Sequence, residues 1–502
     1  MWKVAITLIA LLPSLWSLWQ AGGIPHLGYF HDDGIYAGTA SAIADGKGPR
    51  IESLPGEPWQ IKYPPLYPIY LAAGARSELV LTVLAWLPLP ALLYLLWLWR
   101  GDPWLILFAG WSIYSVIFAS TTLSEVAATC LLLASIHLLE TGRVRSAAVA
   151  VGLTYLTRTA FIALPAGAIA WFLWKRRWRD AMIFAAVFSL FFASWNLFIA
   201  THSPGAVSGG AVYYLSYLPF FRENMTSDVL PIALEVNFQA LIGSLGGVLF
   251  YNAGDQFWEV NFSRLLLLAA MSGLIRQMKR GGPSPYMLMA VPYLAMLTVW
   301  HYVPNERFVY PLLPLLLDGL LTEARHFTEM LPATWTKQRG ATIVFGALVG
   351  SGALWMCIRN ATAAWAYPPA VPRMYRAAAA DRESAYAWIR GNTSETANFL
   401  AAEDPALRRA TGRHGIGVHC PPRFFYKNDT NAIIAYHLEL IDRMPAENLQ
   451  YILIGPFDLI QDIREADRAK IIENWKTRPE LETVYQNERF MIRKWRPLQS
   501  GM

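Results

Sequence analysis

The sequence predicts a polytopic α-helical membrane protein that ends in a small α/β domain. Of its 502 residues, 55% are hydrophobic and only 16% are charged, whereas soluble domains usually carry about a quarter charged residues. Its mean hydropathy is +0.30. Apolar runs follow one another as far as residue 358, and the remainder is more polar. We therefore expect one membrane body, residues 1–358, and a smaller domain, residues 359–502.

Apolar runs in the membrane body predict about eleven spans, because a span needs about 20 apolar residues, or somewhat fewer where the helix is short. The runs lie near 4–20, 77–99, 103–119, 123–140, 145–157, 159–174, 181–200, 262–276, 285–301, 308–324 and 340–358. Residues 145–174 are compatible with one or two short helices. A re-entrant or membrane-lying helix is expected at 229–251.

Lysine and arginine gather in alternate connections, which predicts the orientation because cytoplasmic loops are enriched in these residues. The basic connections are Arg100, Arg143 with Arg145, Lys175–Arg179, Arg276–Arg280 and Arg325–Arg339. With a cytoplasmic N-terminus, all of them face the cytoplasm. The loop 21–76 and the C-terminal domain then lie outside, which in a bacterial inner membrane is the periplasm. These clusters account for the net charge of +6 without a nucleic-acid partner.

The C-terminal domain alternates helical and strand-like stretches. "ESAYAWIRGN" has helical spacing, whereas "ANFLAAE" and "QYILIGPF" are typical of short strands. "ETVYQNERFMIRKW" predicts a strand or hairpin near the end of the chain. The three cysteines form no C-x-x-C pair, so neither a zinc site nor a disulfide framework is indicated.

The first outer loop contains two adjacent acids, Asp32 and Asp33, and the stretch "DGIYAGTASAIADG" that begins with Asp33 has helical spacing. Carboxylates are favoured at a helix N-terminus, so the pair fits a helix cap. It equally fits a general base with a neighbour that tunes it, or oxygen ligands for a divalent cation such as Mg²⁺ or Mn²⁺. The residues alone leave these readings open.

Four further charged residues are expected on the outer side. Lys62 precedes a rigid Pro-Pro segment in "KYPPLYP" and is either a phosphate contact or an interfacial lysine whose amine reaches water. Glu125, Arg158 and Arg307 lie at the outer ends of predicted spans. Charges within spans are expensive and usually functional, so an outward-facing polar cavity is favoured over separate helix-end charges.

Several motifs together resemble the membrane glycosyltransferases of the GT-C fold. They are "DDGIY", "KYPPLYP", "LSE", "GLTYLTR" and "ERFVYPLLP", and they span roughly residues 1–325. The chain is most similar to the branch that holds protein O-mannosyltransferases and the lipid A aminoarabinose transferase. The resemblance implies transfer of a sugar, with inversion, from a polyprenyl-phosphate carrier to a lipid, glycan or protein acceptor on the outer face of the membrane.

The resemblance also implies roles for residues of the first loop. The family's catalytic acid is the first residue of a D-[DE] pair, which matches Asp32 as general base. The second residue is commonly Glu, so Asp33 departs from the pattern and its role stays open. Lys62 matches the lysine that binds the carrier phosphate, with Tyr63 intervening before the prolines as a departure.

The other charged residues correspond to residues of the family by position more than by motif. Glu125 corresponds to a second outer acid, and Arg158 and Arg307 resemble basic residues that face the same cavity and support the donor phosphate. If a metal takes part, the resemblance leaves Asp32, Asp33 and Glu125 as its ligands. Neither the donor sugar nor the acceptor is specified by the sequence.

Three other functions compete with a transferase. A secondary transporter or flippase would show inverted repeats and mid-span charges, and neither is seen. A cytoplasmic nucleotide-sugar transferase would show D-x-D, which the sequence lacks, in a soluble domain on the opposite side of the membrane. The third alternative is a non-enzymatic scaffold protein. The only features that argue against it are the paired acids and the charged residues expected on the outer side.

Overall fold

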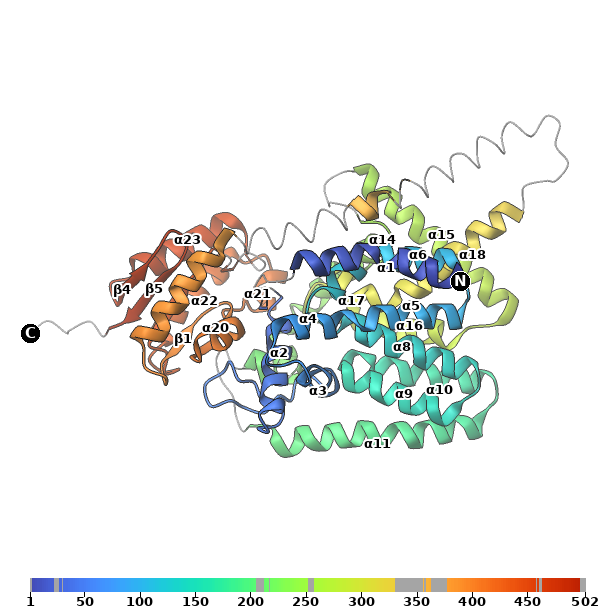
Figure 1. Ribbon diagram of the computed structural model, residues 1–502, viewed down its shortest axis with the longest axis horizontal. Helices are drawn as coiled ribbons and strands as arrows, with labels where there is room; N and C mark the ends of the chain where they lie inside the picture. Colours follow the sequence, from blue (N-terminus) through green and yellow to red (C-terminus); the bar gives the residue numbers. More distant parts are fainter. Residues whose placement is uncertain are drawn as a thin grey trace, which may run out of the picture. The chain divides into compact units, whose positions relative to one another are not determined.

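The computed structural model is mostly helical, with one β-sheet near the C-terminus (Figure 1). It describes residues 2–21, 27–28, 30–204, 212–215, 217–251, 257–329, 355, 358–362, 377–456, 458–459 and 463–496. The chain forms two compact units. The helical unit comprises Met1–Gly22, Thr82–Trp195 and Asn237–Ala370, and the mixed unit comprises Gly23–Leu81, Asn196–Val236 and Val371–Met502.

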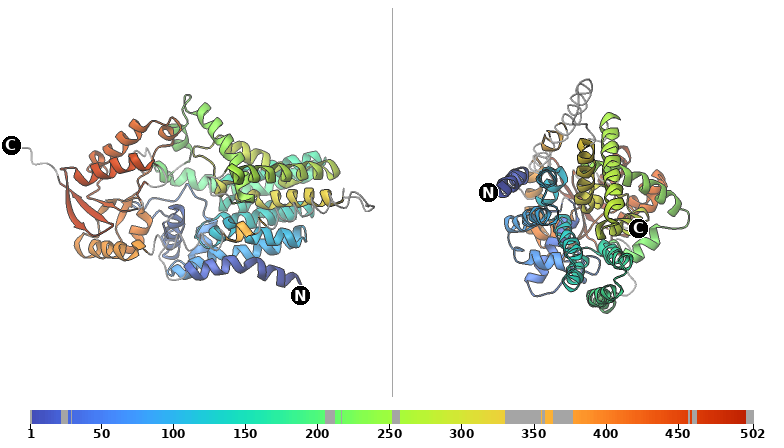
Figure 2. Two further views of the ribbon diagram at one scale, coloured as in Figure 1. Left: turned by 90° about the horizontal axis from the view of Figure 1, so that it is seen from above. Right: turned by 90° about the vertical axis from the view of Figure 1, so that its right-hand side faces the viewer.

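The long helices of the helical unit run nearly parallel, and the right-hand view of Figure 2 shows them end-on. The helices in the first half of the chain are α1 (Trp2–Ala21), α2 (Asp32–Ala44), α3 (Leu66–Ala72), α4 (Glu78–Trp86), α5 (Pro88–Trp99), α6 (Pro103–Trp111), α7 (Ile113–Ala119), α8 (Glu125–Glu140), α9 (Val144–Thr157), η1 (Thr159–Ile162), α10 (Ala163–Trp174) and α11 (Trp178–His202). They continue with α12 (Val212–Leu215), α13 (Tyr217–Asn224), α14 (Leu230–Leu249), α15 (Phe257–Gly281), α16 (Pro285–Thr298), α17 (Glu306–Val309), η3 (Tyr310–Leu312) and α18 (Leu313–Glu329).

The predicted spans agree with the described helices in position. Five segments within the described residues are long and apolar enough to cross a membrane: Trp2–Gln20, Glu78–Trp99, Trp178–His202, Leu230–Leu249 and Phe257–Gly281. Shorter apolar helices cover Val144–Thr157, Thr159–Trp174 and Pro285–Thr298, so residues 145–174 form two helices. The predicted span at 340–358 lies almost entirely outside the described residues.

Two predicted spans and one predicted surface helix differ in detail from the structure. Pro88 begins α5 directly after α4, because proline lacks the N–H that would continue the helix ladder. Ser112 is extended and separates α6 from α7. Helix α14 meets the length of a span, yet Asn237 and Ser244 on it bond to carbonyl groups of residues 298–304. Its placement as a re-entrant or membrane-lying helix stays a prediction.

The C-terminal part of the mixed unit is an α/β domain around a mixed sheet of order β2-β1-β3-β5-β4. Its strands are β1 (Asn398–Leu400), β2 (His414–Ile416), β3 (Tyr451–Ile454), β4 (Leu481–Gln486) and β5 (Met491–Trp495). Strand β1 pairs in parallel with β2 and β3, and β5 runs antiparallel to β3 and β4. The predicted strands and hairpin are confirmed, and β2 is an addition.

Helices cover this sheet and bury its apolar side chains. They are a helix at 377–392, α20 (Asp404–Thr411), α22 (Thr430–Arg443) and α23 (Glu465–Thr477), and the short α21 (Pro422–Tyr426) packs against α22. The predicted helix "ESAYAWIRGN" contributes Tyr386 and Ile389 to a core with Phe399, Leu453 and Ile492. Helices α22 and α23 pack against each other (Figure 1).

The predicted helix of the first loop is α2, which packs against α3 and α20 within the mixed unit. Gly34 permits the contact with α20: a Cβ there would lie 2.6 Å from the Cβ of Pro405. This close approach brings the first turn of α2 beside residues of the C-terminal domain.

Candidate active site

Asp32 and Asp33 occupy the first turn of α2, where the helix dipole favours negative charge. The N-cap position belongs to His31, whose φ of 58° lies in the left-handed region and whose side chain makes no capping bond. The prediction that the acids begin a helix is confirmed, although neither is its N-cap.

The two acids have different surroundings. Asp33 is fully buried and accepts backbone N–H groups from Gly28 at 3.1 Å, Phe30 at 3.2 Å and Gly34 at 2.9 Å. The bonds from Gly28 and Phe30 hold the preceding loop against the helix. Asp32 is only partly buried and accepts the Tyr63 hydroxyl at 2.5 Å. Asp32 is thus the more accessible of the two carboxylates, and the oxygens of Asp33 are taken up by backbone N–H groups.

The segment with Lys62 is ordered by its own sequence. Gln60 Oε1 accepts the backbone N–H groups of Lys62 and Tyr63 at 3.1 and 3.0 Å. The rigid Pro64-Pro65 pair then leads into α3. As a result Tyr63 faces Asp32, and Lys62 Nζ donates to the carbonyl oxygen of Tyr213 at 2.6 Å. Tyr63, the departure from the family motif, thus contacts the predicted base.

Lys62 is 4% exposed and has aromatic neighbours. Its Nζ lies 3.7 Å from the ring centroid of Tyr213, 5.2 Å from that of Tyr217 and 5.4 Å from that of Tyr63, within cation–π range. Burial lowers the pKa of Lys62 to about 8, and the nearby charge of Asp32 only partly opposes this. Burial and the charge of Asp32 both raise the pKa of Tyr63, so its hydroxyl remains a donor.

A further network, which sequence reasoning missed, joins the first loop to the C-terminal domain. His31 Nε2 lies 3.0 Å from Asp404 Oδ1 and 3.2 Å from the Tyr214 hydroxyl. Tyr214 donates to Asp404 at 2.7 Å and accepts the Gly417 N–H at 2.8 Å. Burial opposes protonation of His31, but the hydrogen bond and charge of Asp404 outweigh it and raise the His31 pKa. The position of His31 directly before Asp32 was the one available signal.

Glu125, Arg158 and Arg307 meet in the helical unit. Glu125 is fully buried, and its Oε1 accepts Arg158 Nη1 at 2.5 Å and also Arg307 Nε. Ser124 accepts Arg158 Nη1 at 3.3 Å, and Asn305 caps α17, which carries Arg307. Two arginines donate to one carboxylate oxygen, which holds their guanidinium groups close together. Glu125 thus acts as a counter-ion that positions both arginines.

The predicted residues therefore form two groups. Asp32, Asp33 and Lys62 belong to the mixed unit, whereas Glu125, Arg158 and Arg307 belong to the helical unit. In the mixed unit Tyr63 donates to Asp32, and in the helical unit Arg158 and Arg307 both donate to Glu125. That the two groups share one cavity stays a prediction.

The described residues do not offer an evident metal centre. No group of three His, Cys, Asp or Glu side chains suited to a metal ion occurs among them. Asp33 directs its oxygens to three backbone N–H groups, and Glu125 Oε1 to two arginines. The proposed ligand set of Asp32, Asp33 and Glu125 does not fit this arrangement, so we derive no step through a cation.

The arrangement of these helices and the appended mixed sheet is shared with solved structures of another protein. The chain is similar to the crystal structure of ArnT from Cupriavidus metallidurans bound to undecaprenyl phosphate, with a TM-score of 0.55, 13% identity and 98% of each chain covered. For the apo state of ArnT from the same organism the TM-score is 0.52, with 12% identity and 98% and 97% of the two chains covered. No protein-family model matches the sequence, and no curated protein matches it significantly.

The likeness confirms the expected fold class: a multi-pass membrane protein of the GT-C fold with a C-terminal mixed-sheet domain. It extends over nearly the whole chain. At such low identity it establishes the fold and not the reaction.

Proposed function

We propose that this protein transfers a sugar from a polyprenyl-phosphate carrier to a hydroxyl or amine of an acceptor at the outer face of the membrane. The observation that supports this most directly is the pairing of a partly exposed acid, Asp32, with a buried lysine, Lys62, on one loop. The first supplies a base and the second a cation for a phosphate. The fold is shared with a protein whose crystal structure holds undecaprenyl phosphate.

In the proposed step, the acceptor oxygen or nitrogen attacks the anomeric carbon from the side opposite the phosphate. A new bond to the sugar forms as the bond between the anomeric carbon and the phosphate oxygen breaks, and its electron pair leaves with the polyprenyl phosphate. The acceptor proton passes to Asp32. Attack from the opposite side inverts the configuration, and Tyr63 holds the Asp32 carboxylate by its hydrogen bond.

The leaving group is a phosphate, which needs electrostatic support more than a proton. Lys62 supplies one positive charge. Arg158 and Arg307 are proposed to supply two more, with Glu125 holding their guanidinium groups in place. An arginine is well suited to this task because it meets phosphate oxygens through two parallel N–H groups.

The decisive experiment replaces the proposed base. Asp32→Asn preserves the size of the side chain and its acceptor oxygen for Tyr63 but removes the base, so transfer should fall by about 10²–10⁴-fold while thermal unfolding changes little. Release of polyprenyl phosphate from a panel of lipid-linked sugars measures transfer. Glu395→Gln, at an exposed position of the C-terminal domain, is the control. Wild-type transfer by Asp32→Asn would exclude Asp32 as the base.

The same preparation separates a transferase from a transporter or flippase. Protein reconstituted in vesicles with a labelled lipid-linked sugar and an acceptor should release free carrier. Movement of label across the bilayer without carrier release would instead support the transport function.

A further inference from the structure

A cavity lies in the mixed unit, along one face of α2. It has a volume of about 590 Å³, within the usual range for small-molecule sites. Gly34, Gly38 and Ser41 of α2 line it together, one turn apart on one face of the helix. Asp32 lies two residues before Gly34, about 200° round the helix. The cavity therefore opens on the side of α2 away from the proposed base.

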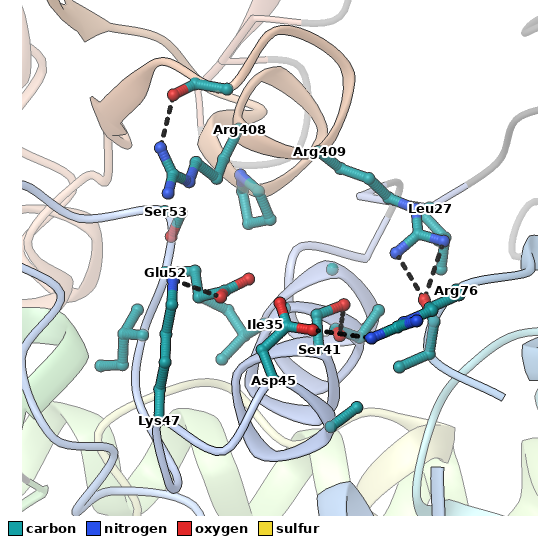
Figure 3. A pocket seen from close by; sticks show the side chains of 18 residues that line it. Leu27, Ile35, Ser41, Asp45, Lys47, Glu52, Ser53, Arg76, Arg408 and Arg409 are labelled. Carbon is teal, nitrogen blue, oxygen red and sulfur yellow. Dashed lines mark hydrogen bonds and ion pairs between the residues drawn. The ribbon is translucent and has the colours of Figure 1, made fainter. Parts of the chain in front are cut away.

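Basic residues stand on two sides of this cavity, as Figure 3 shows. On one side, Lys47 and Arg408 bond to the same carboxylate, Glu57, at 3.1 and 2.6 Å. Lys47 also bonds to Glu52 at 3.2 Å. The charges on this side are thus balanced.

The other side carries a surplus positive charge. Arg409 donates from both Nη atoms to the carbonyl oxygen of Ala75, each at 3.2 Å, and forms no carboxylate pair among the described residues. Arg76 meets Asp45 at 3.5 Å with 84% of its side chain exposed, and such an exposed pair contributes little. Arginine has five N–H donors, so both guanidinium groups retain donors for a ligand.

A buried hydroxyl provides an independent indication of a ligand. Ser53 lines the cavity and is 5% exposed. Its Oγ has no hydrogen-bond partner among the described residues. A buried polar group without a partner is costly, and a ligand hydroxyl or a water molecule would remove that cost.

We propose that this cavity binds the anionic sugar of a glycan or glycolipid, one that bears a phosphate or carboxylate group. Arg76 and Arg409 bind the anionic group, and Ser53 and the polar side formed by Lys47 and Glu52 bind hydroxyls. The site is separate from the transfer centre and does not depend on the proposed reaction.

Binding is tested by calorimetry on the full chain in detergent, with glucose 6-phosphate as probe and glucose as its neutral counterpart. Glucose 6-phosphate should bind measurably and more weakly at higher salt, and glucose should bind at least tenfold more weakly. Each lost charged contact is expected to weaken binding about tenfold, so Arg76→Gln combined with Arg409→Gln should abolish it at the same concentrations. Arg390→Gln, on the same domain but outside the cavity, should bind like the wild type.

Gly38→Leu locates the site without changing any charge. A Cβ at Gly38 would meet no atom within 4 Å, so leucine there would fill empty cavity and should block glucose 6-phosphate. Gly38→Ala, which favours the helix and leaves most of the space, should bind normally. The proposal is overturned if glucose binds as well as glucose 6-phosphate, or if either the double arginine variant or Gly38→Leu binds like the wild type.

Two lipid environments distinguish the sources of the anionic group. The titration is repeated in nanodiscs of phosphatidylcholine alone and with phosphatidic acid. Weaker binding of glucose 6-phosphate in the second would show that a lipid headgroup reaches the same cavity, whereas unchanged binding would assign the site to a glycan sugar.

Discussion

Buried ionisable side chains dominate the chemistry of this protein at the scale of single residues. Lys62, Glu125 and Asp404 are almost or fully inaccessible, and a buried charge is tolerated only where partners stabilise it. Lys62 has the Tyr213 carbonyl group and aromatic rings, Glu125 has two arginines, and Asp404 has His31 and Tyr214. Ionisable side chains that are buried beside specific polar or charged partners are candidates for functional sites.

Lys62 should make donor binding sensitive to pH. Because its pKa is lowered to about 8, the amine is charged at pH 7 and mostly neutral at pH 9, so the affinity for a phosphate should fall as the pH rises through 8. Lys62→Arg stays charged and should flatten this dependence, while Lys62→Ala should bind weakly throughout. The measurement is KM for the lipid-linked donor between pH 6.5 and 9.5. A wild-type KM that is constant across this range would contradict the role of Lys62.

Asp404 should stabilise the fold through His31. Asp404→Ala removes the acceptor of two buried groups and should lower the free energy of unfolding by about 1–3 kcal/mol. Asp404→Asn keeps an acceptor oxygen and should lose less.

The His31 pKa is raised in the folded state, so the stabilisation from the charged pair is complete below the unfolded pKa of about 6.5. It is lost as the pH rises through the raised value. Thermal unfolding of wild type and Asp404→Ala should therefore differ less at pH 9 than at pH 6. A difference that grows with pH would refute this account.

At the scale of elements, short breaks and close contacts shape the helical unit. Pro88 and Ser112 interrupt apolar stretches that hydropathy alone would predict to be single helices. Helices α15 and α18 approach so closely that a Cβ at Gly273 would overlap the carbonyl oxygen of Gly319. Small residues at such crossings let helix backbones come together, as is common in membrane proteins.

This contact predicts a position-dependent effect of alanine. Gly273→Ala should force α15 and α18 apart at a cost of about 1–3 kcal/mol, exceeding the gain in helix propensity of about 1 kcal/mol. Gly243→Ala, in α14, meets no atom within 4 Å and should keep that gain. The two variants are compared by thermal unfolding in detergent. Equal melting temperatures would show that the α15–α18 contact adjusts at no cost.

At the scale of the whole molecule, the proposed reaction requires the two units to act on one donor. Lys62 belongs to the mixed unit, and Arg158 belongs to the helical unit. If both bind the same leaving phosphate, the loss of one should change the effect of losing the other.

A double-mutant cycle tests this requirement. Lys62→Ala and Arg158→Gln should each lower kcat/KM for transfer, and the double variant should depart from additivity by about 0.5–3 kcal/mol. Arg276→Gln, whose guanidinium group pairs with Glu323 elsewhere in the helical unit, should be additive with Lys62→Ala. Strict additivity of Lys62→Ala with Arg158→Gln would place the two side chains on different ligands.

The sequence by itself determined the class of protein, most helices, the strands of the C-terminal domain and the residues worth testing. Apolar runs, the alternation of apolar and polar residues, and prolines are local signals, because each acts within one helix or strand. The orientation of the chain across the membrane also rests on the distribution of lysine and arginine, and it stays a prediction.

Only the tertiary structure decided the partners of those residues. His31 meets Asp404 across 373 positions, Lys62 meets the carbonyl group of Tyr213 across 151, and Arg307 meets Glu125 across 182. No local pattern encodes such contacts, because they arise when separately formed elements pack and buried polar groups find partners. For the same reason, only the tertiary structure shows that Asp32 and Asp33 have different hydrogen-bond partners.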